Sequence, residues 1–261
     1  MYANYHTHTF RCHHAVGTER EYIETAIAHG IRILGFSDHS PYVFDGSEYS
    51  GFRVTHEDTP DYFETLLRLR DEYKDDIRIL IGFEAEYYPK LFRKTLAFLH
   101  DFPLDYLIMG QHFTRNEYDE GAWWCPNPTD NPEILKDFVD QTCEGLQTGC
   151  FSYMAHPDVL NFTGDDTVYE QEMSRLCACA KECGIPLEIN FLGLRERRHY
   201  PSRRFLRIMG EMQNTVIYGC DAHSPDAVWQ PETEREADEL RREYGLALVP
   251  ELSVRNPFAC L

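Results

Sequence analysis

The chain has 261 residues, enough for one α/β barrel domain, and its 43% hydrophobic and 26% charged residues are typical of a globular protein. Its formal net charge of -19 argues against a nucleic-acid partner, because a phosphate backbone requires clustered Lys and Arg. The sequence shows neither an apolar stretch as long as a membrane span nor the segments of a signal peptide. We therefore predict a single domain over residues 1–261, cytoplasmic and without a membrane partner.

Six apolar runs, in chain order, each lead to a side chain that can bind a metal ion. The runs cover residues 3–5, 31–36, 77–83, 104–109, 151–154 and 216–220, and they lead to His6 and His8, Asp38 and His39, Glu84, His112, His156, and Asp221 and His223. Short apolar runs are typical of buried strands, and parallel α/β folds gather their chemistry where such strands end. The sequence thus predicts that these side chains meet at one rim.

A single histidine at such a position is most often a packed core or rim residue. We keep that interpretation for His29, His56 and His100, and for His199 it stays open beside a catalytic one. Repetition at six strand ends favours a metal centre instead, because imidazole and carboxylate together suit zinc, iron and manganese.

Helical segments separate the strands. Helices are predicted at residues 18–29, 60–74, 132–148, 167–184 and 202–213, each opened by a capping residue, namely Thr18, Thr59, Asn131, Thr167 and Ser202. A further strand-like run covers residues 186–190. This alternation predicts right-handed crossovers and a parallel sheet, and ligands at successive strand ends favour a closed barrel over an open sheet.

Two long loops, at about residues 40–58 and 113–131, are rich in aromatic residues and glycine. We predict that they fold over the barrel mouth as pocket walls, and a contact between copies in a dimer is the alternative. In the first loop, Tyr42, Phe44, Asp45 and Glu48 are candidates for recognising an amine or imidazole. The sequence sets no oligomeric state, so a homo-oligomer stays open.

The nine cysteines do not indicate disulfides, because an odd number without a secretion signal predicts reduced thiols. Cys177, Cys179 and Cys183 lie on one predicted helix, where buried packing is expected. Cys12 and Cys220 lie beside candidate ligands and are interpreted as packing residues.

The spacing of the candidate ligands suits metal binding. His6 and His8 are two positions apart, so both side chains leave a strand on the same side, and Asp221 and His223 repeat this spacing. Glu84 stands alone at its strand end, where its two oxygens could bridge ions about 3.5–4 Å apart.

These segments, in order, resemble the motifs of the PHP (polymerase and histidinol phosphatase) superfamily, and most of all its histidinol-phosphatase branch. The motifs are His6-x-His8-Thr9 with His14, Gly35-Phe36-Ser37-Asp38-His39-Ser40-Pro41, Gly82-Phe83-Glu84, Gly110-Gln111-His112, Ala155-His156-Pro157 and Gly219-Cys220-Asp221-Ala222-His223-Ser224. Residues 187–190 and 193–202 also resemble that branch.

The resemblance implies an α/β fold, a distorted seven-stranded, TIM-like β/α barrel, with three divalent metal ions at the C-terminal ends of the strands. It implies that His6, His8, Glu84 and Asp221 hold the first ion, Glu84, His112 and His156 the second, and His14, His39 and His223 the third. A shift of one residue in the loop would exchange His14 for His13. The ions could be zinc, iron or manganese.

The resemblance also implies a phosphomonoesterase that converts L-histidinol phosphate to L-histidinol in histidine biosynthesis. A hydroxide bridging two ions at Glu84 would attack phosphorus, and Asp38 or His199 would protonate the leaving group. Asp38 is equally placed to orient His39.

Phosphate contacts are predicted from Arg195 and Arg197, together with His39 and His223, because a guanidinium matches a pair of phosphate oxygens. The alternative for this arginine-rich stretch is a solvated loop paired with the acidic surface. The expected partner is a small phosphorylated amino-alcohol, whose positive charge suits an acidic protein.

Two other functions remain open. One is a PHP phosphoesterase for another small ester, such as a nucleotide or sugar phosphate, because metal ligands specify the reaction and loops the substrate. The other is a non-catalytic metal-binding module, which the complete set of candidate ligands disfavours.

Overall fold

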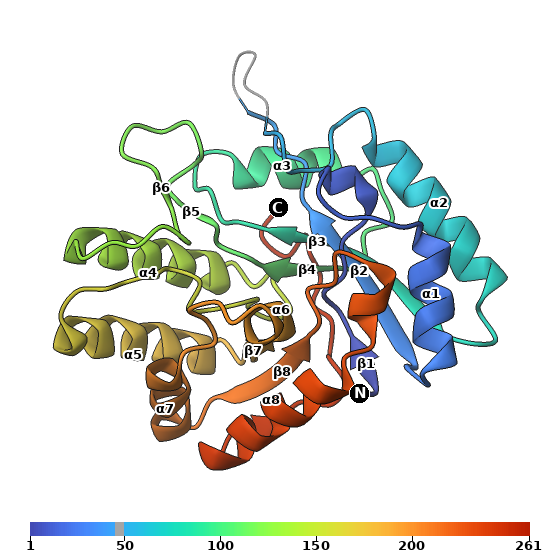
Figure 1. The fold of residues 1–261 in the computed structure, drawn as a ribbon. Coiled ribbons are helices and arrows are strands. Elements are labelled where there is room, and N and C mark those ends of the chain that lie inside the picture. The colour runs from blue at the N-terminus through green and yellow to red at the C-terminus, as the bar shows by residue number, and fades with distance from the viewer. Residues whose placement is uncertain (45–49) are drawn as a thin grey trace.

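A computed structural model describes residues 1–44 and 50–261 of the protein, so the candidates Asp45 and Glu48 lie outside the described residues. Parallel strands occupy the centre and helices surround them (Figure 1). The strands β1 (Ala3–Asn4), β2 (Ile33–His39), β3 (Arg78–Ala85) and β4 (Tyr106–Met109) pair in that order, and β7 (Leu187–Asn190), β8 (Thr215–Gly219) and β9 (Ala247–Leu248) form a second parallel group. A short antiparallel pair, β5 (Phe113–Thr114) and β6 (Trp123–Trp124), lies in the second long loop.

Isolated bridges join the two groups of strands into one curled sheet. Met154 bridges both Met109 of β4 and Leu187 of β7, and Thr7, after β1, bridges Ala222, after β8. The predicted strand at residues 151–154 is therefore reduced to one bridging residue, Met154. Its pairing with β7 cannot extend further back, because Pro186 has no N–H to donate. The α/β class and the parallel sheet are confirmed, and a closed barrel of seven strands stays a prediction.

Five helices match the predicted segments, namely α1 (Glu19–Ala28), α2 (Thr59–Glu72), α4 (Pro132–Gln147), α5 (Asp166–Glu182) and α7 (Arg203–Met212). The capping box of Thr18 is present, and Asn131 and Ser202 cap their helices as expected. Two expected caps were wrong. The α5 cap is Asp165, whose carboxylate accepts the amide of Thr167, and Thr59 lies inside α2.

The remaining helical elements were not predicted. They are η1 (Phe10–Cys12), α3 (Phe92–Leu99), α6 (Phe191–Arg195), η2 (Pro225–Val228) and α8 (Pro231–Glu243). Among the described residues, no helix combines the length and the apolar character needed to cross a membrane.

A small apolar core inside the curled sheet leads directly into the rim that carries the candidate ligands. Leu80 belongs to this core, the ring of Tyr106 packs against Gly82, and Glu84 lies two residues further along the same face of β3. The hydroxyl of Tyr106 donates to the carbonyl of Tyr5 at 2.8 Å, which ties β4 to β1 across the interior. The sheet is therefore filled below the rim, and the chemistry lies at its carboxyl end.

Candidate metal centre

Pairing between the ends of β1 and β8 brings two predicted ligand pairs together. The bridge between Thr7 and Ala222 turns the flanking side chains of both segments to the same face. His8 Nε2 thus lies 3.2 Å from Asp221 Oδ1, and His6 Nε2 lies 3.6 Å from the same oxygen. The two His/Asp-x-His segments form one continuous group of ligands, although about 200 residues separate them in the chain.

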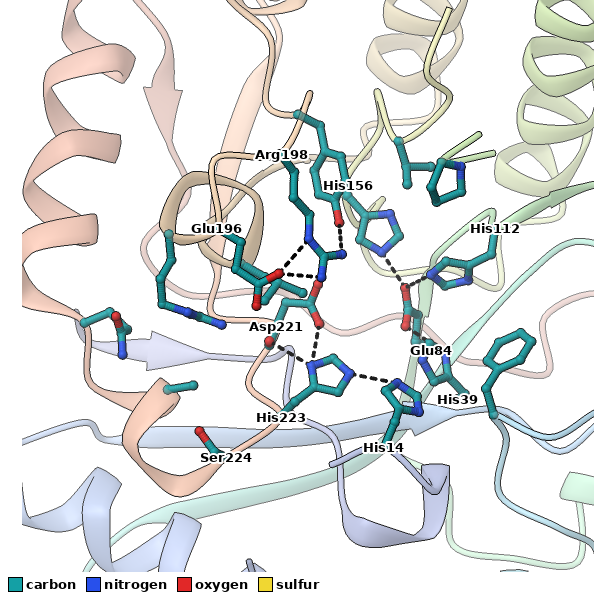
Figure 2. Close-up of a pocket in the computed structure, with 18 of the residues that line it drawn as sticks. His14, His39, Glu84, His112, His156, Glu196, Arg198, Asp221, His223 and Ser224 are labelled. Atoms are coloured by element: carbon teal, nitrogen blue, oxygen red, sulfur yellow. Dashed lines mark hydrogen bonds and ion pairs between the residues drawn. The ribbon is translucent and has the colours of Figure 1, made fainter. Parts of the chain in front are cut away.

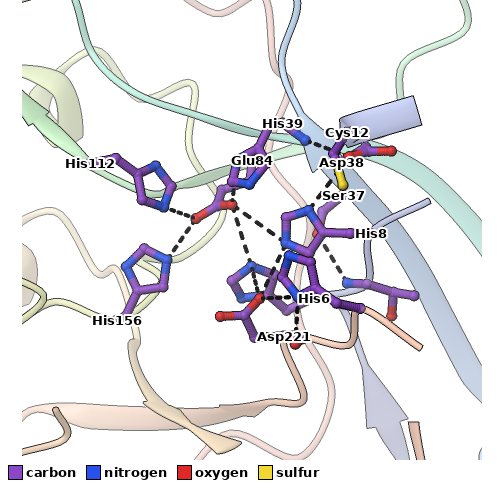
Figure 3. Close-up of polar contacts among 12 residues, drawn as sticks. His6, His8, Cys12, Ser37, Asp38, His39, Glu84, His112, His156 and Asp221 are labelled. Atoms are coloured by element: carbon purple, nitrogen blue, oxygen red, sulfur yellow. Dashed lines mark hydrogen bonds and ion pairs between the residues drawn. The ribbon is translucent and has the colours of Figure 1, made fainter. Parts of the chain in front are cut away.

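Glu84 lies at the centre of the site (Figure 3). Glu84 lies opposite His39 in the register of the parallel strands β2 and β3. Its carboxylate occupies space next to Gly110 that a Cβ atom at that position would fill. Oε2 faces one set of imidazoles, at 3.6 Å from His6 Nε2, 3.6 Å from His8 Nε2 and 3.1 Å from His39 Nδ1. Oε1 faces the other set, at 2.7 Å from His156 Nε2 and 3.4 Å from His112 Nε2.

Hydrogen bonds at Nδ1 direct the other ring nitrogen of several histidines into the site. His6 Nδ1 donates to Glu188 Oε1 at 2.8 Å, and His112 Nδ1 donates to Glu86 Oε1 at 2.8 Å. Because a carboxylate only accepts, each Nδ1 carries a proton, and in the neutral form of the ring Nε2 then presents a lone pair. This carboxylate–histidine arrangement is the one that orients metal ligands in proteins.

His14 lies beside His223 and His39, the other two members of the third predicted group. His14 Nδ1 donates to the carbonyl of Cys12 at 2.7 Å and His223 Nδ1 donates to the carbonyl of Asp221 at 3.1 Å. The two Nε2 atoms then face each other at 3.1 Å, and both line the cavity described below. Two facing lone pairs repel unless a cation or a shared proton lies between them, so this pair could bind an ion or share a proton.

The charges of the site favour cations. Burial alone would raise the pKa of Glu84, but His112, His39 and His6 outweigh it and hold that pKa well below its usual range. Burial likewise acts to lower the pKa of His6, and the carboxylates of Glu188, Asp221 and Glu84 raise it to about 10 instead. Clustered carboxylates therefore attract positive charge to this rim.

The side chains present fit a polynuclear metal centre. Several buried nitrogen and oxygen atoms have no hydrogen-bond partner in the part of the chain that the structure describes, namely His6 Nε2, both ring nitrogens of His8, His39 Nδ1, His156 Nδ1 and Glu84 Oε2. Buried polar atoms without partners are costly, and coordination to an ion would satisfy most of these. Their ligand atoms also gather in threes, among them His6, His8 and Asp221, and His6, Glu84 and His156.

Two candidate ligands have unusual backbone conformations. His156 has φ 27° and Asp221 has φ 47°, in the left-handed region that residues other than glycine seldom adopt. Such conformations cost about 1–3 kcal/mol each and concentrate at functional sites. Packing of the surrounding fold must offset this conformational energy to keep the two side chains directed toward the rim.

A cavity of about 820 Å³ opens over the ligands (Figure 2). Phe52 and Trp124, from the two long loops, form an aromatic wall, which confirms the prediction that these loops wall a pocket. Glu196, Arg198 and Asp226 also line the cavity. The cavity is much larger than a phosphate group, so it has room for an organic leaving group as well.

The predicted phosphate-binding residues have different positions. Arg195 lines the cavity, and its Nη1 is buried without a hydrogen-bond partner. His39 and His223 also line the cavity. Arg197 is 73% exposed and pairs with Glu236 at 2.5 Å, so the structure does not bring it to the site and supports the solvated-loop alternative for this residue.

Neither predicted proton donor reaches the cavity. His199 Nε2 donates to the carbonyl of Val159 at 2.8 Å. Asp38 is fully buried, accepts from the backbone and hydroxyl of Thr9, and lies 3.5 Å from His8 Nδ1. The structure therefore supports the orienting alternative for Asp38, with His8 rather than the His39 ring as its neighbour.

The proposed amine-recognition residues also lie elsewhere. Tyr42 is buried and donates to the backbone carbonyl of Glu86, and Phe44 packs on Tyr42 and Tyr118. Neither belongs to the cavity wall. The first long loop reaches the cavity through Gly51 and Phe52 instead.

Sequence reasoning missed several polar residues around the ligands. Glu86 and Glu188 hold two of the histidines, and Arg198 lines the cavity while it pairs with Glu196 at 2.6 Å. The two glutamates carried a usable signal, because each is a charged residue next to or inside an apolar strand. Buried carboxylates in such positions require a partner.

The curled parallel sheet and the histidine–carboxylate cluster at its rim define an α/β protein with a candidate hydrolytic metal centre. Residues 4–191 match the model of the PHP domain family, and the chain belongs to that family. The matched range ends before Asp221 and His223, so their place in the site comes from the structure.

Relatives support the same assignment. A probable histidinol-phosphatase of Deinococcus radiodurans is 28% identical over 242 residues, covering 85% of this chain and 86% of that protein. A probable histidinol-phosphatase of Schizosaccharomyces pombe is 25% identical over 250 residues, covering 85% of this chain and 81% of that protein. The predicted family, its histidinol-phosphatase branch and the prediction of an enzyme that hydrolyses phosphoric monoesters are thereby confirmed.

A solved structure shares the fold. It is the histidinol phosphate phosphatase of Lactococcus lactis complexed with zinc, L-histidinol and phosphate, which aligns with a TM-score of 0.72. The alignment covers 96% of this chain and 98% of that chain at 19% sequence identity.

Proposed function

We propose that this protein is a metal-dependent phosphomonoesterase whose substrate is L-histidinol phosphate. The observation that carries the proposal is the position of Glu84, whose two oxygens face two separate sets of imidazoles under one large cavity. A carboxylate that reaches two ligand sets suits neighbouring ions, as in many phosphatases. The names of the relatives support the substrate.

The proposal includes three divalent ions, zinc, iron or manganese. His6, His8, Glu84 and Asp221 would hold the first, Glu84, His112 and His156 the second, and His14, His39 and His223 the third. When bound, such ions acidify water and neutralise the charge of a phosphate ester. The curled sheet would then correspond to the seven-stranded barrel of the family.

The residues of the chain would divide the remaining work. Arg195, which lines the cavity and whose buried Nη1 has no hydrogen-bond partner among the described residues, would bind a phosphate oxygen and hold the ester in place. His39 and His223 border the same space. Glu188 and Asp38 would fix the orientation of His6 and His8 from behind, at 2.8 Å and 3.5 Å from their Nδ1 atoms.

The cavity walls suit the organic part of this substrate. Histidinol phosphate carries an ammonium group and an imidazole, which are complementary to carboxylates and to aromatic rings. Asp226 and Glu196 offer carboxylates in the cavity lining, and Phe52 and Trp124 offer aromatic rings. A nucleotide or sugar phosphate would use the same phosphate contacts but would gain less from these carboxylates.

Phosphate release from L-histidinol phosphate, beside a panel of nucleotide and sugar phosphates, tests the proposal. The protein is assayed with measured metal content, before and after treatment with a chelator. Chelator-sensitive hydrolysis with a strong preference for histidinol phosphate is the expected result. Preference for another ester would overturn the substrate, and inactivity of the fully metallated protein toward the whole panel would favour a binding module.

A further inference from the structure

Arg53 is a buried arginine beside the candidate metal centre that does not itself line the cavity. Its side chain is 2% exposed. Its guanidinium donates to both oxygens of Glu86, from Nη1 at 2.7 Å and from Nη2 at 2.8 Å. A buried guanidinium is costly unless it is paired in this bidentate way.

The contacts of Arg53 continue to a candidate ligand. Glu86 is fully buried and shares its Oε1 between Arg53 Nη2 and His112 Nδ1, each at 2.8 Å. His112 in turn lies 3.4 Å from Glu84 through Nε2 (Figure 3 shows this last pair). Arg53 therefore stands behind the carboxylate that fixes the ring orientation of His112.

Arg53 also connects both loops that wall the cavity. Its Nε donates to Glu117 Oε1 at 2.8 Å, and Glu117 belongs to the second long loop. Its guanidinium carbon lies 4.4 Å from the ring centroid of the neighbouring Phe52, whose ring is 5.1 Å from that of His39. One guanidinium thus contacts the wall of the cavity and the support of a candidate ligand.

We propose that Arg53 is a positioning residue of the metal centre, which acts through Glu86 to hold His112 in its ligating orientation. The inference rests on the proposed function in one respect, namely that His112 binds a metal ion. Without Arg53, the Glu86 carboxylate would lose two of the three hydrogen bonds that it accepts among the described residues and keep only the one from His112 Nδ1, so it would no longer be held in the orientation that fixes this ring. Lysine cannot replace these bonds, because its single ammonium lacks the planar fork.

Metal titration of the full-length protein tests the proposal, with zinc or manganese as the probe and R53M and E86Q as the variants. Both variants should weaken the binding of one ion by about 10–100-fold, the effect typical of supports behind a ligand, and leave the other ions bound. The double variant R53M/E86Q should bind that ion no more weakly than E86Q alone, because Arg53 acts through Glu86.

Glu117→Gln is the matched control, since it alters the loop contact of Arg53 and leaves its pair with Glu86 intact. It should retain metal affinity and change KM more than kcat. If R53M unfolds, R53K keeps a charge at the site and should still show weaker binding of one ion.

Unchanged affinity in a folded R53M or R53K, or additive losses in the double variant, would overturn the proposal. The readout does not depend on the substrate. A protein that binds metal but ignores histidinol phosphate would contradict the proposed function and leave this test intact, whereas a wild-type protein that binds no metal would overturn both.

Discussion

The space at Gly110 offers a direct test of how closely the fold fits Glu84. A Cβ atom at position 110 would lie 1.8 Å from Glu84 Oε1 and 2.5 Å from its Cδ. Non-bonded heavy atoms need roughly 3.5 Å, so in Gly110→Ala the carboxylate must move by about 1.7 Å. Glu84 is 1% exposed and imidazoles surround it, so the movement takes it away from one set of ligands.

The expected result of Gly110→Ala is a loss of metal and of turnover in a protein that still folds. A displacement of about 1 Å at a reacting centre costs about 100-fold in rate, so kcat should fall by at least about that factor. Overpacking should lower the free energy of unfolding by about 1–3 kcal/mol. The measurements are bound metal per chain, kcat for phosphate release and urea unfolding.

Gly51→Ala is the matched control for this substitution. Gly51 lines the same cavity, but a Cβ at this position would meet no atom of the described residues within 4 Å. The control should keep its metal and a rate near that of the wild type. The reasoning fails if Gly110→Ala retains both metal content and kcat, because Glu84 would then tolerate a displacement that the structure forbids.

Three further substitutions test other parts of the site. Arg195→Gln should lower kcat/KM by about 10–100-fold, which is the effect of losing a hydrogen bond from a charged group. Arg197→Gln should behave like the wild type, because Arg197 is exposed and paired with Glu236. Equal effects of the two substitutions would contradict the different positions of the two arginines. Glu188→Gln keeps the shape of the side chain but removes the charge beside His6. In a metal titration it should weaken the binding of one ion by about 10–100-fold. Burial raises the pKa of Asp158 to about 6 from 3.8, so its contribution to stability is complete below pH 4 and is lost as the pH rises through 6. Urea unfolding of the metal-free proteins checks this, with the free energy of unfolding of Asp158→Asn compared with that of the wild type at pH 4 and at pH 7. The difference between variant and wild type should shift by about 2–3 kcal/mol in favour of the variant from pH 4 to pH 7. A difference that does not change with pH would refute this.

The candidate ligands were predictable from sequence because they follow a local rule. His6, His39, Glu84 and His156 each end a short apolar run, and parallel strands bring such ends to one rim. The third site was harder, because His14 lies in a loop beyond the strand. Only the family motif favoured it over His13, and the structure places its Nε2 at 3.1 Å from His223.

The surroundings of the ligands were not predictable in the same way. Glu188 reaches His6 across 182 positions of sequence, and Arg53 reaches Glu86 across 33. Such pairs depend on tertiary packing, which apolar periodicity does not report. Tyr42 shows the opposite error, because an aromatic residue in a loop near the rim indicated recognition, whereas the chain buries it against Tyr88 at 4.9 Å between ring centroids.

The bridge between Thr7 and Ala222 has a consequence for the synthesis of this protein. His6 and His8 are synthesised more than 200 residues before their partner Asp221. During translation the candidate ligand cluster therefore stays incomplete until β8 has joined the sheet. A chain that ends before that strand lacks both Asp221 and His223, so it could not assemble the cluster described above.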